Sequence, residues 1–187
     1  MFCFGPVGSK IGSLIIFQSS GLRGLMMAVG DVLTNRTVLD GVSFSEVVAA
    51  SKRIAPYALR TPVSTCSKLN SIAGHQLFFK CENLQKAGAF KFRGACNTLA
   101  AMRPDLLKRG VVTHSSGNHA GALALAAKMF GTTATIIMPT NSIAVKRDAV
   151  IEYGGNVVPC QPNQADREAT AARVEAETGA ILVPPYD

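Results

Sequence analysis

The sequence contains no long uninterrupted apolar run, although 48% of its 187 residues are hydrophobic. A membrane-spanning helix needs about 18 consecutive apolar residues, and Gly, Ser, Arg or Lys interrupts every candidate stretch. A transmembrane span is therefore not expected. The apolar content is enough for the core of one ordinary domain or two small ones, which indicates a globular protein.

Blocks of like charge are also absent, although the formal net charge is +7. Proteins that bind nucleic acids usually gather Lys and Arg along one segment or on one face. The dispersed charge here suits small anions, such as phosphates and carboxylates, equally well. No nucleic-acid partner is expected.

Cysteine pairs of the C-x-x-C type are missing as well. No two of the five cysteines have the spacing of metal ligands, and an odd number of cysteines cannot all be paired in disulfides. Neither a zinc site nor a disulfide framework is therefore indicated. No metal site is expected from the residues of this chain. A reducing compartment, and hence the cytoplasm, is the simpler location. The five are Cys3, Cys66, Cys81, Cys96 and Cys160.

Acidic residues are absent before Asp31. An acid-poor start is typical of mitochondrial transit peptides, but the first 30 residues contain only Lys10 and Arg23 as basic residues, which is few for such a peptide. Mitochondrial targeting and an untargeted extension both remain open. Residues 1–42 are expected to form an N-terminal extension, possibly disordered, outside the fold.

Apolar periodicity predicts alternating strands and helices after this extension. Ser43 and Glu46 form a capping box that begins a helix over 44–54. This order of elements is typical of an α/β fold with a mostly parallel sheet covered by helices on both faces. Further helices are expected over 66–72, 90–102, 119–130, 144–153 and 166–178, and strands over 77–79, 111–112, 134–138, 156–158 and 180–183.

Lys91 lies in the first turn of the predicted helix 90–102. The positive end of the helix dipole and the nearby Arg93 disfavour a protonated ammonium group, which favours the free amine needed for Schiff-base chemistry. The alternative is an ordinary solvated lysine.

A second polar segment, Thr113 to His119, follows a predicted strand and begins a predicted helix. Its small residues allow close backbone approach, and its unpaired amides, hydroxyls and Asn118 side chain could bind a carboxylate or phosphate oxygen. The alternative is that Ser116 or Asn118 merely caps the helix.

The two segments together, LFFKCENLQKAGAFKFRGA from Leu77 and VVTHSSGNHAGALALAAK from Val111, resemble the serine racemase and serine/threonine dehydratase branch of the fold-type II pyridoxal-phosphate enzymes. The resemblance extends from about Ser45 to Asp187. It implies a three-layer parallel-sheet architecture, in which 43–109 is the first part of a large cofactor-binding domain and 110–187 a small α/β domain.

The resemblance also assigns roles to residues. Lys91 would bind pyridoxal 5'-phosphate covalently, Phe90 would lie against its ring, and Asn118 would bind its phenolic oxygen. The substrate carboxylate would be held by Ser115, Ser116, Asn118 and His119. The glycine-rich phosphate cradle of the family lies beyond residue 187, and Gly154-Gly155 is better explained as a helix stop.

The implied reaction starts when Lys91 removes the Cα proton of an amino acid. If Ser116 returns a proton on the opposite face, L-serine becomes D-serine; if the β-hydroxyl leaves instead, pyruvate and ammonia form. Ala89 favours the racemase branch. A threonine/serine dehydratase is an alternative, and an inactive fragment that binds other subunits is an alternative of another class.

Activation by ATP and Mg is a further implication of the resemblance. The positions that match the nucleotide site are Cys66, Ser67, Lys86 and Tyr153. Gly121 departs from the racemase pattern, which has Gln there and uses it to bind the nucleotide. A small amino acid, serine or threonine, is the expected substrate, and a homodimer the expected assembly.

Overall fold

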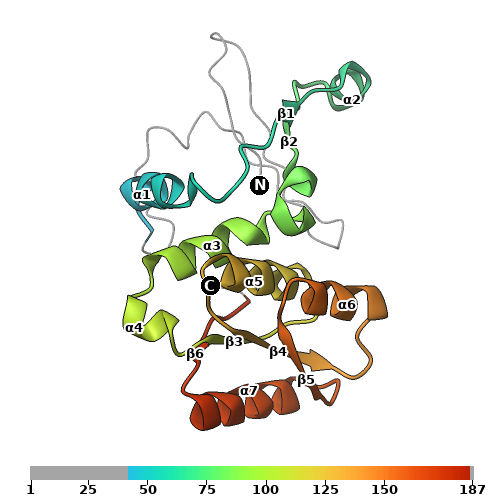
Figure 1. Cartoon of the computed structure of the whole chain (residues 1–187). Helices are drawn as coiled ribbons and strands as arrows, with labels where there is room; N and C mark the ends of the chain where they lie inside the picture. The colour runs from blue at the N-terminus through green and yellow to red at the C-terminus, as the bar shows by residue number, and fades with distance from the viewer. Residues whose placement is uncertain (1–41, 186–187) are drawn as a thin grey trace.

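The computed structural model describes residues 42–185, and its centre is a four-stranded parallel sheet. The strand order is β5-β4-β3-β6, so β3 lies between β4 and β6. All four strands run in one direction, and their carboxyl ends therefore meet at one edge of the sheet (Figure 1). Their bounds are β3 (Val111–His114), β4 (Ala134–Pro139), β5 (Asn156–Cys160) and β6 (Ile181–Leu182).

Helices cover both faces of this sheet. Figure 1 shows α7 on one side and α5 and α6 on the other, with α3 and α1 stacked further out beyond α5. The predicted α/β class with a parallel sheet is confirmed. The helices are α1 (Phe44–Ile54), α2 (Ser67–Ala73), α3 (Lys91–Ala101), α4 (Pro104–Leu107), α5 (Asn118–Met129), α6 (Ala144–Glu152) and α7 (Gln164–Thr178).

The alternation of strand side chains divides the core in two. Val111 and Ile136 belong to a cluster on the α5 side, while Val112 and Ile137 belong to a cluster on the α7 side. Successive side chains of a strand point to opposite faces, so strands buried on both faces are apolar throughout. This pattern explains why the sequence shows continuous apolar runs here.

A small arm precedes the sheet in the chain. Strand β1 (Val63–Ser64) pairs antiparallel with β2 (Phe79–Lys80), and α2 lies between them. Two 3-10 turns, η2 (Glu82–Leu84) and η3 (Lys86–Gly88), then lead into α3. The sequence did not predict β1, because two residues carry no detectable period.

Local sequence signals predicted several helix ends correctly. Both hydrogen bonds of the Ser43 and Glu46 capping box are present, and α1 has the predicted bounds. Gly179 ends α7 in the left-handed conformation at φ 70°. Pro104 ends α3 as predicted, but it also begins α4, where a missing N–H costs nothing at the first helical position.

The division at residue 109 stays a prediction. One core cluster contains Ile54 of α1 and Phe92 of α3 together with Leu123 of α5 and Ile136 of β4. The two predicted parts thus share buried surface.

No helix in residues 42–185 is long and apolar enough to cross a membrane. The predicted extension over 1–42 lies outside the described residues except for Val42.

Candidate active site

The candidate site lies at the carboxyl edge of the parallel sheet. The segment 115–117 follows β3 and leads into α5, while the segment 183–185 follows β6. Because β3 and β6 are neighbours and parallel, these two segments emerge side by side. Ligands in open α/β sheets usually bind outside the carboxyl ends of the strands.

Lys91 is held at this edge by the segment that follows β6. It is the first residue of α3, and its Nζ donates a hydrogen bond of 2.6 Å to the carbonyl oxygen of Pro185. The ring of Phe90, which is 45% exposed, has its centroid 5.7 Å from the same nitrogen. The amine therefore has a fixed main-chain partner and an accessible aromatic neighbour.

The polar segment after β3 is joined to the neighbouring strand. The Ser115 amide donates to the carbonyl of Ile137 at 3.1 Å, and the Gly117 amide donates to Ser115 Oγ at 3.3 Å. Gly117 occupies the cap position of α5, and no side chain bonds to the first turn there. The alternative that Ser116 or Asn118 caps the helix is therefore wrong, and a helix start without such a cap has amides available for an anion.

His119 lies behind this segment and not on its surface. Its ring is buried at 7% exposure, and Nε2 is 3.3 Å from the carbonyl oxygen of Val183. Val183 and Pro185 thus contact the beginnings of α5 and α3 respectively. The structure brings Lys91, Phe90 and the 115–119 segment to one edge of the sheet, and 183–185 connects them.

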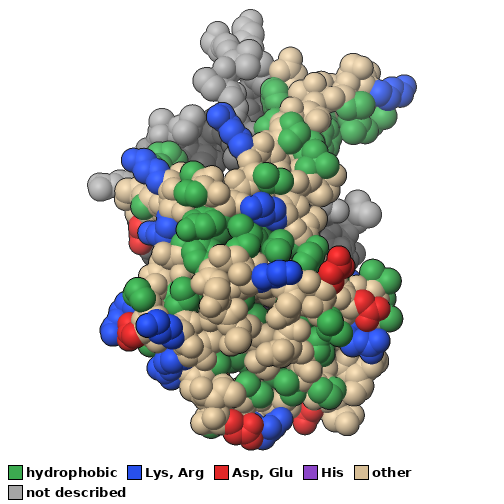
Figure 2. All heavy atoms as spheres, in the orientation of Figure 1, with side chains coloured by type: hydrophobic (Ala, Val, Ile, Leu, Met, Phe, Trp, Pro, Cys, Tyr) green, Lys and Arg blue, Asp and Glu red, His purple; other side chains and the backbone are tan. Residues whose placement is uncertain are grey.

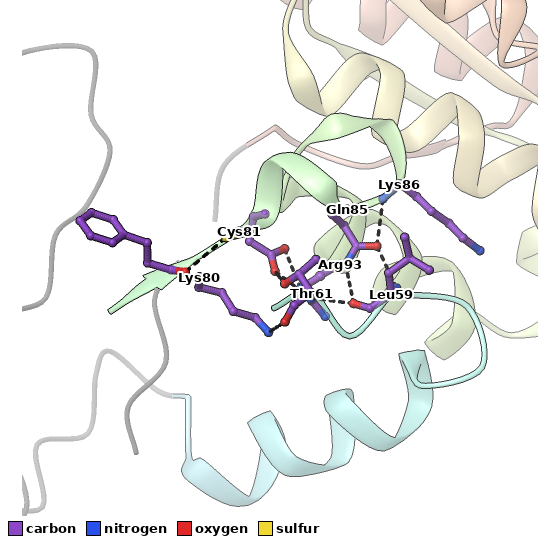
Figure 3. A network of polar contacts seen from close by, with 9 residues as sticks. Leu59, Thr61, Lys80, Cys81, Gln85, Lys86 and Arg93 are labelled. Carbon is purple, nitrogen blue, oxygen red and sulfur yellow. Dashed lines mark hydrogen bonds and ion pairs between the residues drawn. The ribbon is translucent and has the colours of Figure 1, made fainter. Parts of the chain in front are cut away.

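A polar network that the sequence reasoning missed supports the segment before Lys91 (Figure 3). Arg93 donates two hydrogen bonds of 2.8 Å to the two oxygens of Glu82, whose carboxylate also accepts one of 2.6 Å from Thr61. Gln85 exchanges hydrogen bonds of 2.8 and 2.9 Å with the main chain of Leu59. No short-range pattern reveals these contacts, because their partners lie 11 to 26 residues apart.

Glu82 is buried yet charged. Burial opposes its ionisation, but hydrogen bonds from Arg93 and Thr61 and the charges of Arg93 and Lys80 outweigh that effect, so the pKa of the Glu82 carboxyl is lowered. This ion pair corrects one part of the argument for Lys91. Arg93 cannot act on the amine as an uncompensated charge, because the Glu82 carboxylate neutralises it.

The predicted nucleotide-site residues lie in two places. Tyr153 packs against Gly121 of α5, where an added Cβ would be 3.5 Å from the ring. Lys86 Nζ lies 4.0 Å from Met129 Sδ at the other end of α5. Cys66 and Ser67 begin α2, on the arm that Figure 1 shows away from α5 and α6. These four residues do not meet at one site within the described chain, and their role stays a prediction.

A groove of about 740 Å³ lies apart from this edge. It runs between α1 and the face of α3 that carries Gly94 and Asn97, and its walls include neither Lys91 nor the 115–119 segment.

Among residues 42–185, no group of His, Cys, Asp and Glu side chains is arranged to hold a metal ion. On the face drawn in Figure 2, basic and acidic side chains are interspersed.

Comparison with known proteins gives clear matches over most of the chain. The family model described as "Pyridoxal-phosphate dependent enzyme" matches residues 54–187. Serine racemase of Arabidopsis thaliana is 53% identical over 138 residues, which are 74% of this chain and 42% of that protein. The beta-hydroxyaspartate dehydratase of Paracoccus denitrificans is 45% identical over 145 residues, covering 78% of this chain and 46% of that one.

The fold has solved counterparts as well. The structure of maize serine racemase matches with a TM-score of 0.77 and 46% identity, over 78% of this chain and 44% of that chain. The chain thus spans less than half the length of these relatives.

Proposed function

We propose that this chain, which belongs to the pyridoxal-phosphate dependent enzyme family, provides half of a serine racemase-like active site. This half contains the amine that binds the cofactor and the segment that binds the substrate carboxylate. The whole enzyme would interconvert L- and D-serine and also eliminate water from serine, giving pyruvate and ammonia. One observation carries this proposal: the Lys91 amine and the uncapped start of α5 lie at the same edge of the sheet.

The residues present at this edge fit pyridoxal phosphate. Lys91 offers a primary amine, Phe90 an accessible aromatic ring beside it, and Asn118 an exposed amide at the start of α5. In this proposal Lys91 holds the cofactor, Phe90 lies against its ring and Asn118 binds its phenolic oxygen. When bound, the cofactor supplies an electron sink for a carbanion at Cα.

The substrate carboxylate is proposed to bind at Ser115, Ser116, Asn118 and the first-turn amides, where the positive end of the α5 dipole favours an anion. His119 would act through its main chain and by positioning, since its ring faces the carbonyl of Val183. Lys91 would take the Cα proton on one face. Ser116 would return a proton on the other.

Elimination of a β-hydroxyl shares the same first proton transfer, so a threonine/serine dehydratase is a second candidate. The resemblance to a beta-hydroxyaspartate dehydratase favours considering this branch. Activation of the whole enzyme by ATP and Mg, a homodimeric assembly and a cytoplasmic location, with a mitochondrial one as the alternative, belong to the same proposal.

The experiment adds pyridoxal phosphate to the purified chain, reduces it with borohydride, and identifies the labelled peptide by mass spectrometry. We expect a visible absorption band and a label on Lys91. The Lys91→Ala variant should lose both, while Lys108→Ala, which removes an exposed lysine on the surface after α4, should keep them. Equal labelling of Lys91→Ala and the unmodified chain would contradict the proposal.

A further inference from the structure

The segment that follows β6 contacts both helix starts at the candidate site. Val183 is 4% exposed and donates its amide to a carbonyl of β3 at 2.8 Å, so it belongs to the sheet. Its own carbonyl oxygen is 3.3 Å from His119 Nε2. Two residues later, the carbonyl of Pro185 accepts the hydrogen bond of 2.6 Å from Lys91 Nζ. Residues 183–185, which we call the strap, therefore join the start of α5 to the start of α3.

The strap is stiff because two of its three residues are proline. The ring of a proline fixes φ at about −65°, and it also restricts the backbone of the residue before it. Since Val183 is held by the sheet, Pro184 and Pro185 leave the carbonyl that follows them little freedom. Little backbone entropy is lost when such a carbonyl binds a side chain. The acceptor for Lys91 is thus already in place when the amine reaches it.

The Lys91 amine cannot keep this contact while it reacts with an aldehyde. Its nitrogen attacks through a free lone pair, a C=N bond forms, and both hydrogens of the neutral amine leave with the aldehyde oxygen as one molecule of water. The Pro185 carbonyl is only an acceptor, so it binds the nitrogen through an N–H that the neutral product lacks. The contact with the strap and a covalent bond to an aldehyde are therefore alternatives for this nitrogen.

We propose that the strap is an autoinhibitory contact, which holds the Lys91 amine in the chain without cofactor and releases it before pyridoxal phosphate binds covalently. This inference rests on the proposed function, because it takes Lys91 as the amine that binds the cofactor. A hydrogen bond that involves a charged group stabilises a contact by roughly ten- to a hundredfold. The strap should therefore slow every reaction of this amine, whatever the reagent.

The test measures the reactivity of Lys91 toward acetic anhydride, which needs no cofactor site. Trace acetylation of the full 187-residue chain, read by mass spectrometry, compares Lys91 with the exposed Lys108. We expect Lys91 to react roughly tenfold or more slowly. In a chain with both Pro184→Gly and Pro185→Gly, the rate at Lys91 should rise by roughly fivefold or more, because glycine gives the strap conformational freedom. The rate at Lys108 should stay the same.

Pro162→Gly is the matched control. Pro162 is exposed in the loop between β5 and α7, and β5 lies at the opposite end of the sheet from β6. The same chemical change there should leave the rate at Lys91 unchanged.

A second variant tests the contact from its other side and leaves the strap intact. Lys91→Met removes the donor and nearly keeps the length of the side chain. The carbonyl ¹³C resonance of Pro185 should therefore shift in this variant, while that of Pro162 should not.

Three results would overturn the inference: equal rates at Lys91 and Lys108 in the unmodified chain, an unchanged Lys91 rate in a folded double-glycine chain, or a Pro185 resonance that Lys91→Met does not move. The proposed function is judged separately by the pyridoxal phosphate label on Lys91. That label should form faster in the double-glycine chain and reach the same final extent. A label missing from both chains would count against the proposed function, whereas the acetylation rates, which involve no cofactor, would still report on the strap.

Discussion

At the scale of single residues, Glu82 shows how a buried charge organises the approach to Lys91. Its side chain is 8% exposed, and it joins Thr61 on one segment to Arg93 in the first turn of α3. A buried carboxylate is tolerated only when it is paired and hydrogen-bonded. The pair therefore fixes the turns η2 and η3, and with them the beginning of α3.

The lowered pKa of Glu82 predicts a specific pH dependence. A carboxyl whose folded pKa lies below its ordinary value of 4.5 stabilises the fold above that value, and this stability is lost as the pH falls through the lower folded pKa. Glu82→Gln should thus lower the free energy of unfolding by roughly 1–3 kcal/mol near pH 7. The difference from the unmodified chain should shrink below about pH 4, as urea unfolding at several pH values would show.

Glu177→Gln is the control for this prediction. Glu177 pairs with Arg173 on the surface of α7, where both side chains are more than half exposed. Surface pairs of this kind contribute at most about 1 kcal/mol. A Glu82→Gln effect no larger than that of Glu177→Gln, or one that grows toward low pH, would contradict the role assigned to Glu82.

At the scale of elements, replacing either of two glycines at the interface of α5 and α6 by alanine should have opposite effects on the stability of the fold. A Cβ at Gly121, inside α5, would meet only the Tyr153 ring at 3.5 Å, an ordinary contact. A Cβ at Gly155, after α6, would lie 2.8 Å from Val150 Cγ1 and 3.0 Å from Ala124 Cβ. The first position has room for a methyl group and the second does not.

Gly121→Ala should therefore raise the free energy of unfolding by about 0.5–1 kcal/mol, because alanine is the better helix former. Gly155→Ala should lower it by about 1–3 kcal/mol through overpacking. Thermal and urea unfolding of both variants measure this. A stabilised Gly155→Ala chain would show that the contact between α5 and the end of α6 can relax.

The same scale separates what the sequence could predict from what it could not. The α1 helix was predicted with its bounds because Ser43 and Glu46 cap it through contacts three residues apart. The sheet strands were predicted because each contains consecutive apolar residues, such as Val111-Val112 and Ile136-Ile137. In the arm, the helix over 66–72 and the strand over 77–79 were expected, whereas β1 was not, since its pairing joins Val63 to Lys80 across the chain.

The candidate site likewise has features that the sequence predicts and features that it does not. Lys91 and the 115–119 segment were singled out by their places at predicted helix starts, and the family resemblance then assigned their roles. The hydrogen bond from Lys91 to Pro185 and the Glu82–Arg93 pair could not be predicted, because they depend on tertiary packing over 94 and 11 residues.

At the scale of the whole molecule, the shared core decides whether the two predicted parts fold separately. Leu99 of α3 is 1% exposed and belongs to the cluster that includes Leu123 of α5 and Met138 of β4. The α3 and α5 helices pack directly on each other. A core that crosses residue 110 should make 43–109 and 110–187 unfold together.

Leu99→Ala tests this cooperation. Loss of a buried leucine should lower the free energy of unfolding by about 2–5 kcal/mol, and amide exchange should accelerate equally in α1 and in β4, on the two sides of residue 110. Leu69→Ala, the same change at a position 43% exposed on α2, should have an effect within about 0.5 kcal/mol. If α1 opened while β4 kept its protection, the parts would be independent domains, and the packing of α3 on α5 would stabilise only the first of them.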